Sequence, residues 1–268
     1  MPEERTDAER ARRRLVLASI AAVVVAAVVG GGIGLLLARR ANTPATPDPF
    51  GTTDRPIPSA IARIPLVDEV GRTTDLAAFR GRVVILADFM TSCQEICPIT
   101  TGALLTVERS LRAAHLQRRV TIVEASIDPG RDTPSRFRAY DKAFGVHWTM
   151  LTGSVANLDR LWSWFGVVYQ RVAEGKPPAI DWQTGKPYTY DVAHSDEVFV
   201  LDRSGVERAV TAGNPNTGGK LSAALARTLN ANGRQNLAHA GFGSWTPADL
   251  LNTVGSVLGQ SIPLASGA

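Results

Sequence analysis

Hydrophobic and polar positions divide this chain into three parts. Residues 15–38 contain no charged side chain and are built mainly from Ala, Val, Leu, Ile and Gly. Residues 39–57 are polar and contain four prolines. From Pro58 onward, short apolar runs alternate with longer stretches of helical periodicity, which predicts a folded domain of strands and helices.

The first apolar segment, 15–38, predicts a transmembrane helix. At ~1.5 Å per residue such a helix reaches about 36 Å, enough to cross a hydrocarbon core of ~30 Å. Five arginines precede the segment and two follow it. This asymmetry predicts a cell-membrane protein with a single span, a cytoplasmic N-terminus (1–14) and an extracytoplasmic remainder. A cleaved signal peptide is the alternative, although Arg39 and Arg40 make the following site a poor one for cleavage.

The next segment, 39–57, is predicted to be a proline-rich linker, so folding is expected to begin near residue 58. In the domain, 58–230, the apolar pattern alternates between strands and helices. The predicted strands are 82–89, 120–126, 197–201 and 206–211, and the predicted helices are 98–116, 134–144, 155–165 and 219–229. This order is typical of a thioredoxin-like α/β fold, with a central mixed sheet flanked by helices.

A C-terminal extension, 231–268, follows the domain. The segment 246–249, with the sequence TPAD, predicts the capped start of a helix, and the apolar residues after it fall on one face of that helix. We expect this amphipathic helix to pack on its own domain, with docking to a partner or to the bilayer surface as the alternative.

Composition and charge exclude several functions. The chain has 268 residues, 44% hydrophobic, and a formal net charge of +4. Residues 1–40 carry seven arginines against four acids, which leaves 22 bases and 21 acids for the rest. The domain is therefore nearly neutral, and no nucleic-acid partner is expected. Two cysteines are too few for a disulfide scaffold or for a metal site made of four thiolates.

Both cysteines lie in one motif, Cys93-Gln94-Glu95-Ile96-Cys97-Pro98, directly after the first buried strand. Open α/β sheets present their ligand crevice at this end of their strands, and the N-terminus of a following helix favours thiolates. Such a pair can be oxidised to a disulfide or can capture a soft cation such as Cu(I). A purely structural disulfide is a third possibility, but so small a loop gains little chain entropy.

Histidine bears on the choice between these possibilities. Three of the four histidines, His115, His147 and His239, are expected to have solvated or structural roles. His194 differs because it ends a long polar loop just before the strand at 197, and antiparallel placement would return it to the cysteines. Two thiolates and one imidazole would make a three-coordinate soft site. A loop histidine bonded to the backbone is an equally good interpretation at this stage.

Four parts of the domain carry a resemblance to a known family. They are DFMTSC (88–93) with CP (97–98), SIDP (126–129) with RDTP (131–134), WTMLTGS (148–154), and AHS (193–195) with LD (201–202). These motifs resemble the Sco/SenC family of copper chaperones for cytochrome c oxidase assembly, over about residues 60–230. Some members carry an acidic residue directly before the histidine, where this chain has Ala193, and Asp191 is assigned no metal role.

The resemblance implies a membrane-anchored, thioredoxin-like protein that binds one copper ion, Cu(I) or Cu(II), through Cys93, Cys97 and His194. It implies delivery of copper to the dinuclear CuA centre of a respiratory oxidase subunit, a role that is not itself enzymatic. Other copper carriers or thiol reductants would be further partners. The alternative is a thiol-disulfide oxidoreductase in which Cys93 and Cys97 are redox-active and act on client cysteines without metal transfer. A peroxidase is disfavoured, because the Pro and Thr expected ahead of a peroxidatic cysteine are missing.

One further segment stands out. The loop 171–191 is rich in Pro, Tyr and Trp and flanks the proposed ligand His194. It is too long for a simple connector, so we expect it to move on metal binding or to touch the client. A loop packed on its own aromatic residues is the alternative.

Overall fold

The computed structural model describes residues 48–265. The predicted cytoplasmic N-terminus, the anchor 15–38 and the first part of the linker, residues 39–47, lie outside this range. Among residues 48–265, no helix combines the length and the apolar character that crossing a bilayer requires.

The centre of the sheet is the strand β4 (Val83–Phe89), in which every residue is buried. Its apolar residues are covered on both faces, as its nearly continuous hydrophobic sequence predicts. β4 pairs in parallel with β5 (Val120–Ser126), and β5 pairs in parallel with β6 (Thr149–Thr152). The carboxyl ends of these three strands therefore meet at one edge.

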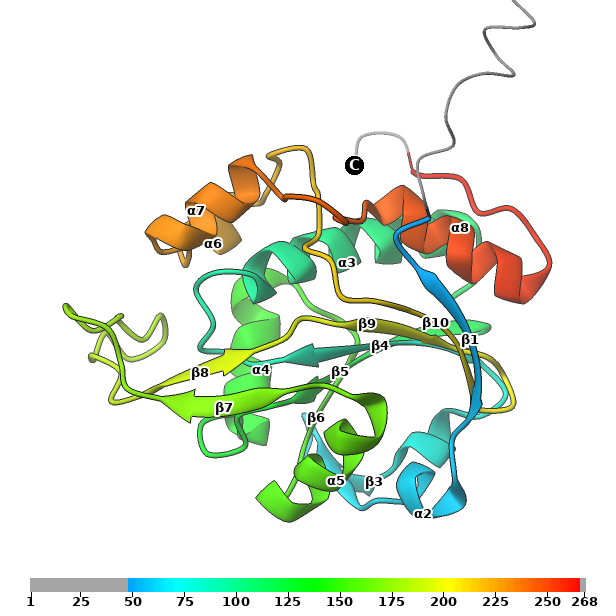
Figure 1. The fold of residues 1–268 in the computed structure, drawn as a ribbon, viewed down its shortest axis with the longest axis horizontal. Helices are drawn as coiled ribbons and strands as arrows, with labels where there is room; N and C mark the ends of the chain where they lie inside the picture. The colour runs from blue at the N-terminus through cyan, green and yellow to red at the C-terminus, as the bar shows by residue number, and fades with distance from the viewer. Residues whose placement is uncertain (1–47, 266–268) are drawn as a thin grey trace, which may run out of the picture. The chain divides into compact units, whose positions relative to one another are not determined.

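Antiparallel strands complete the sheet on both sides, giving the order β1-β10-β9-β4-β5-β6-β2-β3 (Figure 1). The added strands are β1 (Gly51–Pro56), β2 (Leu66–Asp68), β3 (Thr73–Thr74), β9 (Val198–Leu201) and β10 (Val206–Thr211). A turn at 202–205 joins β9 to β10, and the Asp202 N–H bonds the Val206 carbonyl across it at 2.8 Å. The predicted hairpin is therefore present.

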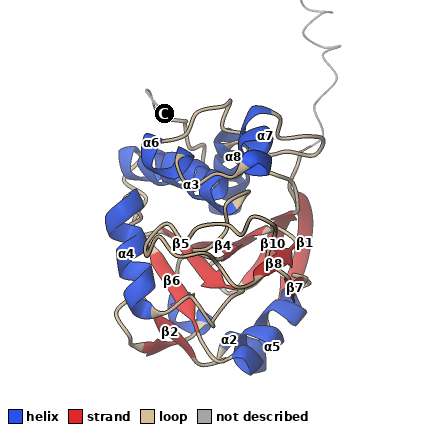
Figure 2. Cartoon of the chain, turned by 90° about the vertical axis from the view of Figure 1, so that its left-hand side faces the viewer, coloured by secondary structure: helices blue, strands red, loops and turns tan. Residues whose placement is uncertain are grey.

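Helices cover both faces of this mixed sheet, in agreement with the predicted α/β class. Figure 2 shows α3, α6, α7 and α8 on one side of the sheet and α2 and α5 on the other. The helices before the extension are α2 (Ser59–Ala62), η1 (Leu76–Phe79), α3 (Cys97–Ala113), α4 (Pro134–Phe144), α5 (Val155–Phe165) and α6 (Ala223–Ala226). Thr133 and Ser154 cap α4 and α5 through their side chains, because each hydroxyl accepts a bond from a backbone N–H three residues on.

Three segments differ from their predicted form. The linker was expected to reach residue 57, but β1 (Gly51–Pro56) already pairs with β10 as an edge strand, where a terminal proline is tolerated. The helix expected over 219–229 shrinks to the single turn of α6. The long loop 171–191 begins and ends in a hairpin of β7 (Tyr169–Val172) and β8 (Asp191–His194). Partner strands across the sheet, which local composition does not reveal, decide the first and third cases.

The extension contains α7 (Ala231–Ala238) and α8 (Pro247–Leu258). Thr246 and Asp249 form a capping box at the start of α8, because each side chain bonds the other residue's backbone N–H. α8 packs against α3 and β4. Trp245, Leu250 and Leu251 have no exposed surface, and they belong to the same buried core as the central strands.

Replacing Leu251 with Ala should therefore destabilise the whole domain. Removing a fully buried leucine side chain leaves a cavity and costs about 2–5 kcal/mol of the free energy of unfolding. Chemical denaturation would measure this loss. Asn252→Ala, at the exposed neighbouring position, is the matched control and should change the free energy of unfolding by less than about 0.5 kcal/mol. Equal small effects of both changes would contradict the packing of α8.

Candidate metal centre

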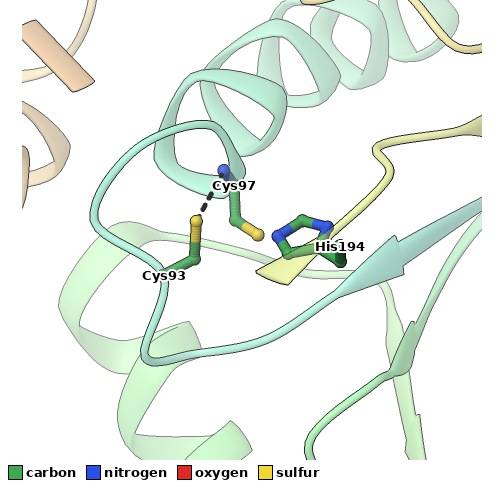
Figure 3. A group of neighbouring side chains, drawn as sticks. All are labelled: Cys93, Cys97 and His194. Atoms are coloured by element: carbon green, nitrogen blue, oxygen red, sulfur yellow. Dashed lines mark hydrogen bonds between the residues drawn. The ribbon is translucent and has the colours of Figure 1, made fainter. Parts of the chain in front are cut away.

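The two cysteines lie where β4 ends and α3 begins. Cys97 is the first residue of α3, and its backbone N–H donates to the sulfur of Cys93 at 3.4 Å (Figure 3). Ile96 occupies the N-cap of α3 without a side-chain bond, and Cys93 satisfies one of the N–H groups that a helix start leaves unpaired. Both cysteines are free thiols and both are buried, with exposed fractions of 8% and 2%.

His194 comes from a different part of the fold. It is the last residue of β8, paired with Tyr169 of β7, and the Ser195 N–H bonds the Val168 carbonyl just beyond the pair. The hairpin thus carries the imidazole back to the cysteines. One donor atom from each of Cys93, Cys97 and His194 lies within 4.8 Å of the others, and Figure 3 shows the Cys97 sulfur directed toward the ring.

The contacts of His194 fix which ring nitrogen a metal could use. Its Nδ1 lies 2.6 Å from the Ser195 carbonyl oxygen and 3.2 Å from Asp88 Oδ2. A carbonyl oxygen can only accept, so Nδ1 carries the proton. In the neutral ring Nε2 is then left with its lone pair, the tautomer that a metal-binding histidine needs.

Asp88 is the site residue that sequence reasoning missed. It sits near the end of β4 with a fully buried side chain, and its Oδ1 accepts the Glu197 N–H at 2.7 Å. Burial alone lowers the pKa of His194, but the hydrogen bonds to Asp88 and to Cys93 outweigh it and raise the pKa to about 12. The signal was present in the sequence, because Asp88 is an acid inside an otherwise apolar strand pattern.

The two thiols are made unequal by their own contact. A hydrogen bond from Cys97 holds the pKa of Cys93 well below its ordinary value, with His194 acting in the same direction. The same contact and burial raise the pKa of Cys97 well above its ordinary value. The arrangement therefore offers a thiolate beside a second thiol and an imidazole, a donor set that suits a soft cation.

The remaining candidates lie outside this group. His115, His147 and His239 are exposed, as their expected solvated roles require. Asp191, on β8, is exposed, and its Oδ1 accepts the Val192 N–H. A second possible metal-binding group among the described residues consists of His194 with Asp88 and Asp196. One ligand atom of each lies within 4.8 Å of the others.

The RDTP segment, 131–134, holds the loop that leads into Cys93. Both the N–H and the hydroxyl of Thr91 donate to Asp132 Oδ1, and Ser126 donates to the other oxygen of the same carboxylate. Burial raises the pKa of Asp132 to about 6, against the lowering effect of these bonds. Arg136, one turn into α4, also bonds Thr91.

The same segment anchors the long loop beside His194. Arg131 pairs with Asp128 and donates to the Tyr190 carbonyl, and Arg136 pairs with Asp181 at 2.9 Å. Trp182 Nε1 donates to the Thr91 carbonyl at 2.7 Å. The loop is thus packed on α4 and on the cysteine loop as well as on its own aromatic residues. A cavity of about 520 Å³ opens between these parts and is lined by Cys93 and His194.

Replacing Asp88 with Asn should lower the pKa of His194. The amide keeps an oxygen for the Glu197 N–H but removes the negative charge that favours the protonated imidazole. NMR titration of the reduced, metal-free protein would measure the change, which should be at least about one pKa unit. Asp191→Asn removes a nearby carboxylate that has no contact with His194 and is the matched control. An unchanged pKa in Asp88→Asn would show that the carboxylate does not govern the imidazole.

Comparison with known proteins places this arrangement in a family. The mitochondrial SCO2 homologue of Bos taurus is 30% identical over 141 residues, which are 53% of this chain and 49% of that protein. The chain spans about half to two thirds of the length of the first such relatives. A crystal structure of Arabidopsis thaliana ScoI with copper bound is 20% identical, with a TM-score of 0.47, and the match covers 60% of this chain and 87% of that one.

The fold is shared with a crystal structure from Aquifex aeolicus VF5. That protein is 18% identical with a TM-score of 0.51, and the match covers 77% of this chain and 94% of that one. The SCO1/SenC family model matches residues 58–230, a range that contains the cysteine motif, the RDTP segment and His194. Because this match covers well over half of the sequence, the chain belongs to the SCO1/SenC family.

Proposed function

We propose that this protein is a copper chaperone that binds one copper ion through Cys93, Cys97 and His194. The observation that carries the proposal is the convergence of two buried thiols and one imidazole within 4.8 Å from separate parts of the chain. Thiolate and imidazole are the ligands that Cu(I) prefers. Copper is the cargo in this role, and it leaves when a client with suitable ligands takes it.

The client we propose is the CuA-bearing subunit of a respiratory oxidase. Support comes from the family, since a relative in the Sco family is described among cytochrome c oxidase assembly proteins. The apolar segment 15–38 further supports an extracytoplasmic domain tethered to the cell membrane by one span. A tether of this kind would keep the domain beside a membrane-bound client.

Within this role the site residues have distinct tasks. The lowered pKa of Cys93 favours its thiolate, whereas the thiol of Cys97 and the protonated ring of His194 must each lose a proton when copper enters. The Ser195 carbonyl and Asp88 hold the Nδ1–H of His194, which leaves Nε2 for the metal. Both sulfurs must be reduced, so a protein oxidised to the Cys93–Cys97 disulfide should bind no copper.

A second candidate function is reduction of a client disulfide. It is favoured by the unequal pKa values of the two thiols, because the thiolate of Cys93 could attack one client sulfur and form a mixed disulfide. Cys97 could then attack the sulfur of Cys93 and release the client. Two electrons and two protons would pass to the client as two thiols, and Cys93 and Cys97 would become a disulfide. His194 is not needed as a ligand in this role.

Titration of the reduced full-length protein with Cu(I) and Cu(II), in detergent, tests the chaperone proposal. We expect one Cu(I) per chain, and we expect Cys93→Ser, Cys97→Ser and His194→Ala each to weaken binding by at least about tenfold to 100-fold. Losing a metal ligand should reduce the copper affinity at least as much as losing a residue that hydrogen-bonds to a ligand, which typically costs about tenfold to 100-fold. A competing Cu(I) chelator would report the affinities.

His147→Ala, which removes an exposed imidazole, is the matched control and should bind as the parent protein does. Indifference of copper binding to all three site changes would overturn the proposal. Reduction of a disulfide in an isolated oxidase subunit that persists in His194→Ala, while copper binding is lost, would favour the reductase.

A further inference from the structure

The extension beyond the family match reaches the loop between the two cysteines. The match to the SCO1/SenC model ends at Asn230, the residue that caps α7, so α7 itself lies beyond the match. Asn230, Asn232 and Gly233, at the start of α7, contact Gln94 and Glu95 of the cysteine loop. We call these three residues the α7 clamp.

Hydrogen bonds form the first part of the clamp. The backbone N–H of Asn230 donates to the Gln94 carbonyl at 2.9 Å. The side-chain amides of Asn230 and Asn232 both donate to Glu95 Oε1, at 2.9 and 3.0 Å. Backbone and side chain of the cysteine loop are thus both held by α7.

Close backbone contact forms the second part. A Cβ atom built on Gly233 would lie 2.3 Å from the Gln94 carbonyl oxygen and 3.0 Å from Glu95 Cα. Both are backbone atoms, which cannot swing aside as a side chain would. Glycine weakens the interior of a helix relative to alanine, so helix stability does not explain Gly233. The close approach of the α7 backbone to the backbone of residues 94 and 95 does, because it leaves no room for a Cβ atom.

The opposite side of the cysteine loop is held as well. Gln94 Nε2 donates to the Ile180 carbonyl of the long loop at 2.8 Å. Residues 94 and 95 are therefore fixed from two directions, while Cys93 and Cys97 remain free thiols. None of the clamp residues contacts a sulfur or the imidazole, so their effect on the site passes through the loop.

We infer that the α7 clamp is a positioning device that holds the Cys93–Cys97 loop in its open dithiol geometry, ready for copper. The inference rests on the proposed copper-binding function. A loop already ordered in its binding geometry loses less conformational entropy when the metal enters, which raises the affinity. The clamp residues act as positioning residues, since their atoms are not donors to the metal.

The clamp should also oppose closure of the disulfide. Closure brings the sulfurs to about 2.05 Å and the Cβ atoms to about 3.5–4.5 Å, and any shift of residues 94–96 that accompanies it would strain the contacts with α7. With oxidised glutathione as oxidant, both thiols lose their protons, two electrons pass to glutathione, and two glutathione thiols form. Contacts that hold the open loop stabilise the dithiol and so disfavour this reaction.

Two variants and one control test the inference in the full-length protein, purified in detergent. Asn232→Ala removes one bond to Glu95 from an exposed position, and Gly233→Ala places a methyl group against Gln94. Gln235→Ala, at an exposed position of the same helix without a contact to the loop, is the control. Asn230 is left unchanged because its side chain also caps α7.

We expect Cu(I) affinity to fall about threefold in Asn232→Ala and about tenfold in Gly233→Ala, on the scale of one or two lost hydrogen bonds. The equilibrium constant for oxidation by glutathione should rise by similar factors. A purely structural role for α7 would lower the unfolding midpoint without moving this redox equilibrium. The control should match the parent protein in both measurements.

Changes at Glu95 complete the test. Glu95→Gln keeps an oxygen that can accept both amides and should retain most of the copper affinity, whereas Glu95→Ala should lose about as much as Gly233→Ala. Folded Asn232→Ala and Gly233→Ala proteins that bind copper and oxidise as the control does would overturn the clamp and leave the proposed function standing. Failure of the parent protein to bind Cu(I) would instead overturn the proposed function.

Discussion

The candidate site depends on the start of one helix directly behind a buried strand. β4 ends among fully buried residues, and α3 begins at Cys97, so the unpaired N–H groups of the helix face the loop that holds Cys93. The sulfur of Cys93 accepts a hydrogen bond from one of these groups, the backbone N–H of Cys97. A negative charge on this sulfur is therefore stabilised by the fold itself, and the reactivity of the pair follows from its place in the backbone.

Around this junction the protein keeps several polar side chains away from water. Asp88 holds His194, Asp132 holds the turn before Cys93, and Arg136 ties the same turn to the long loop. Each of these groups has partners, because an unpaired buried charge would cost several kcal/mol. The extension adds further contacts on the other side of the cysteine loop. The donors are thus positioned by elements that are distant in sequence, which limits the motion that metal entry requires.

Local sequence was enough for the central elements. The continuous apolar pattern before Cys93 predicted β4, and Pro134 after Thr133 predicted the start of α4. The edge strand β1 and the hairpin of β7 and β8 were not predicted, because their residues are mostly exposed and their conformation is decided by the strands that they pair with. Asp88 was overlooked as a partner of His194, because nothing in the spacing of residues 88 and 194 indicates that they meet.

The sequence by itself determined the chemistry that is available, since only one pair of cysteines exists and the motifs around it resemble those of a copper-chaperone family. It also determined the order of the main strands and helices, because hydrophobic periodicity is a local property. Only the tertiary structure decided which carboxylate supports His194, and that α7 reaches the cysteine loop. These contacts join residues about one hundred or more positions apart, and such pairs are selected by the packing of whole elements rather than by any local preference.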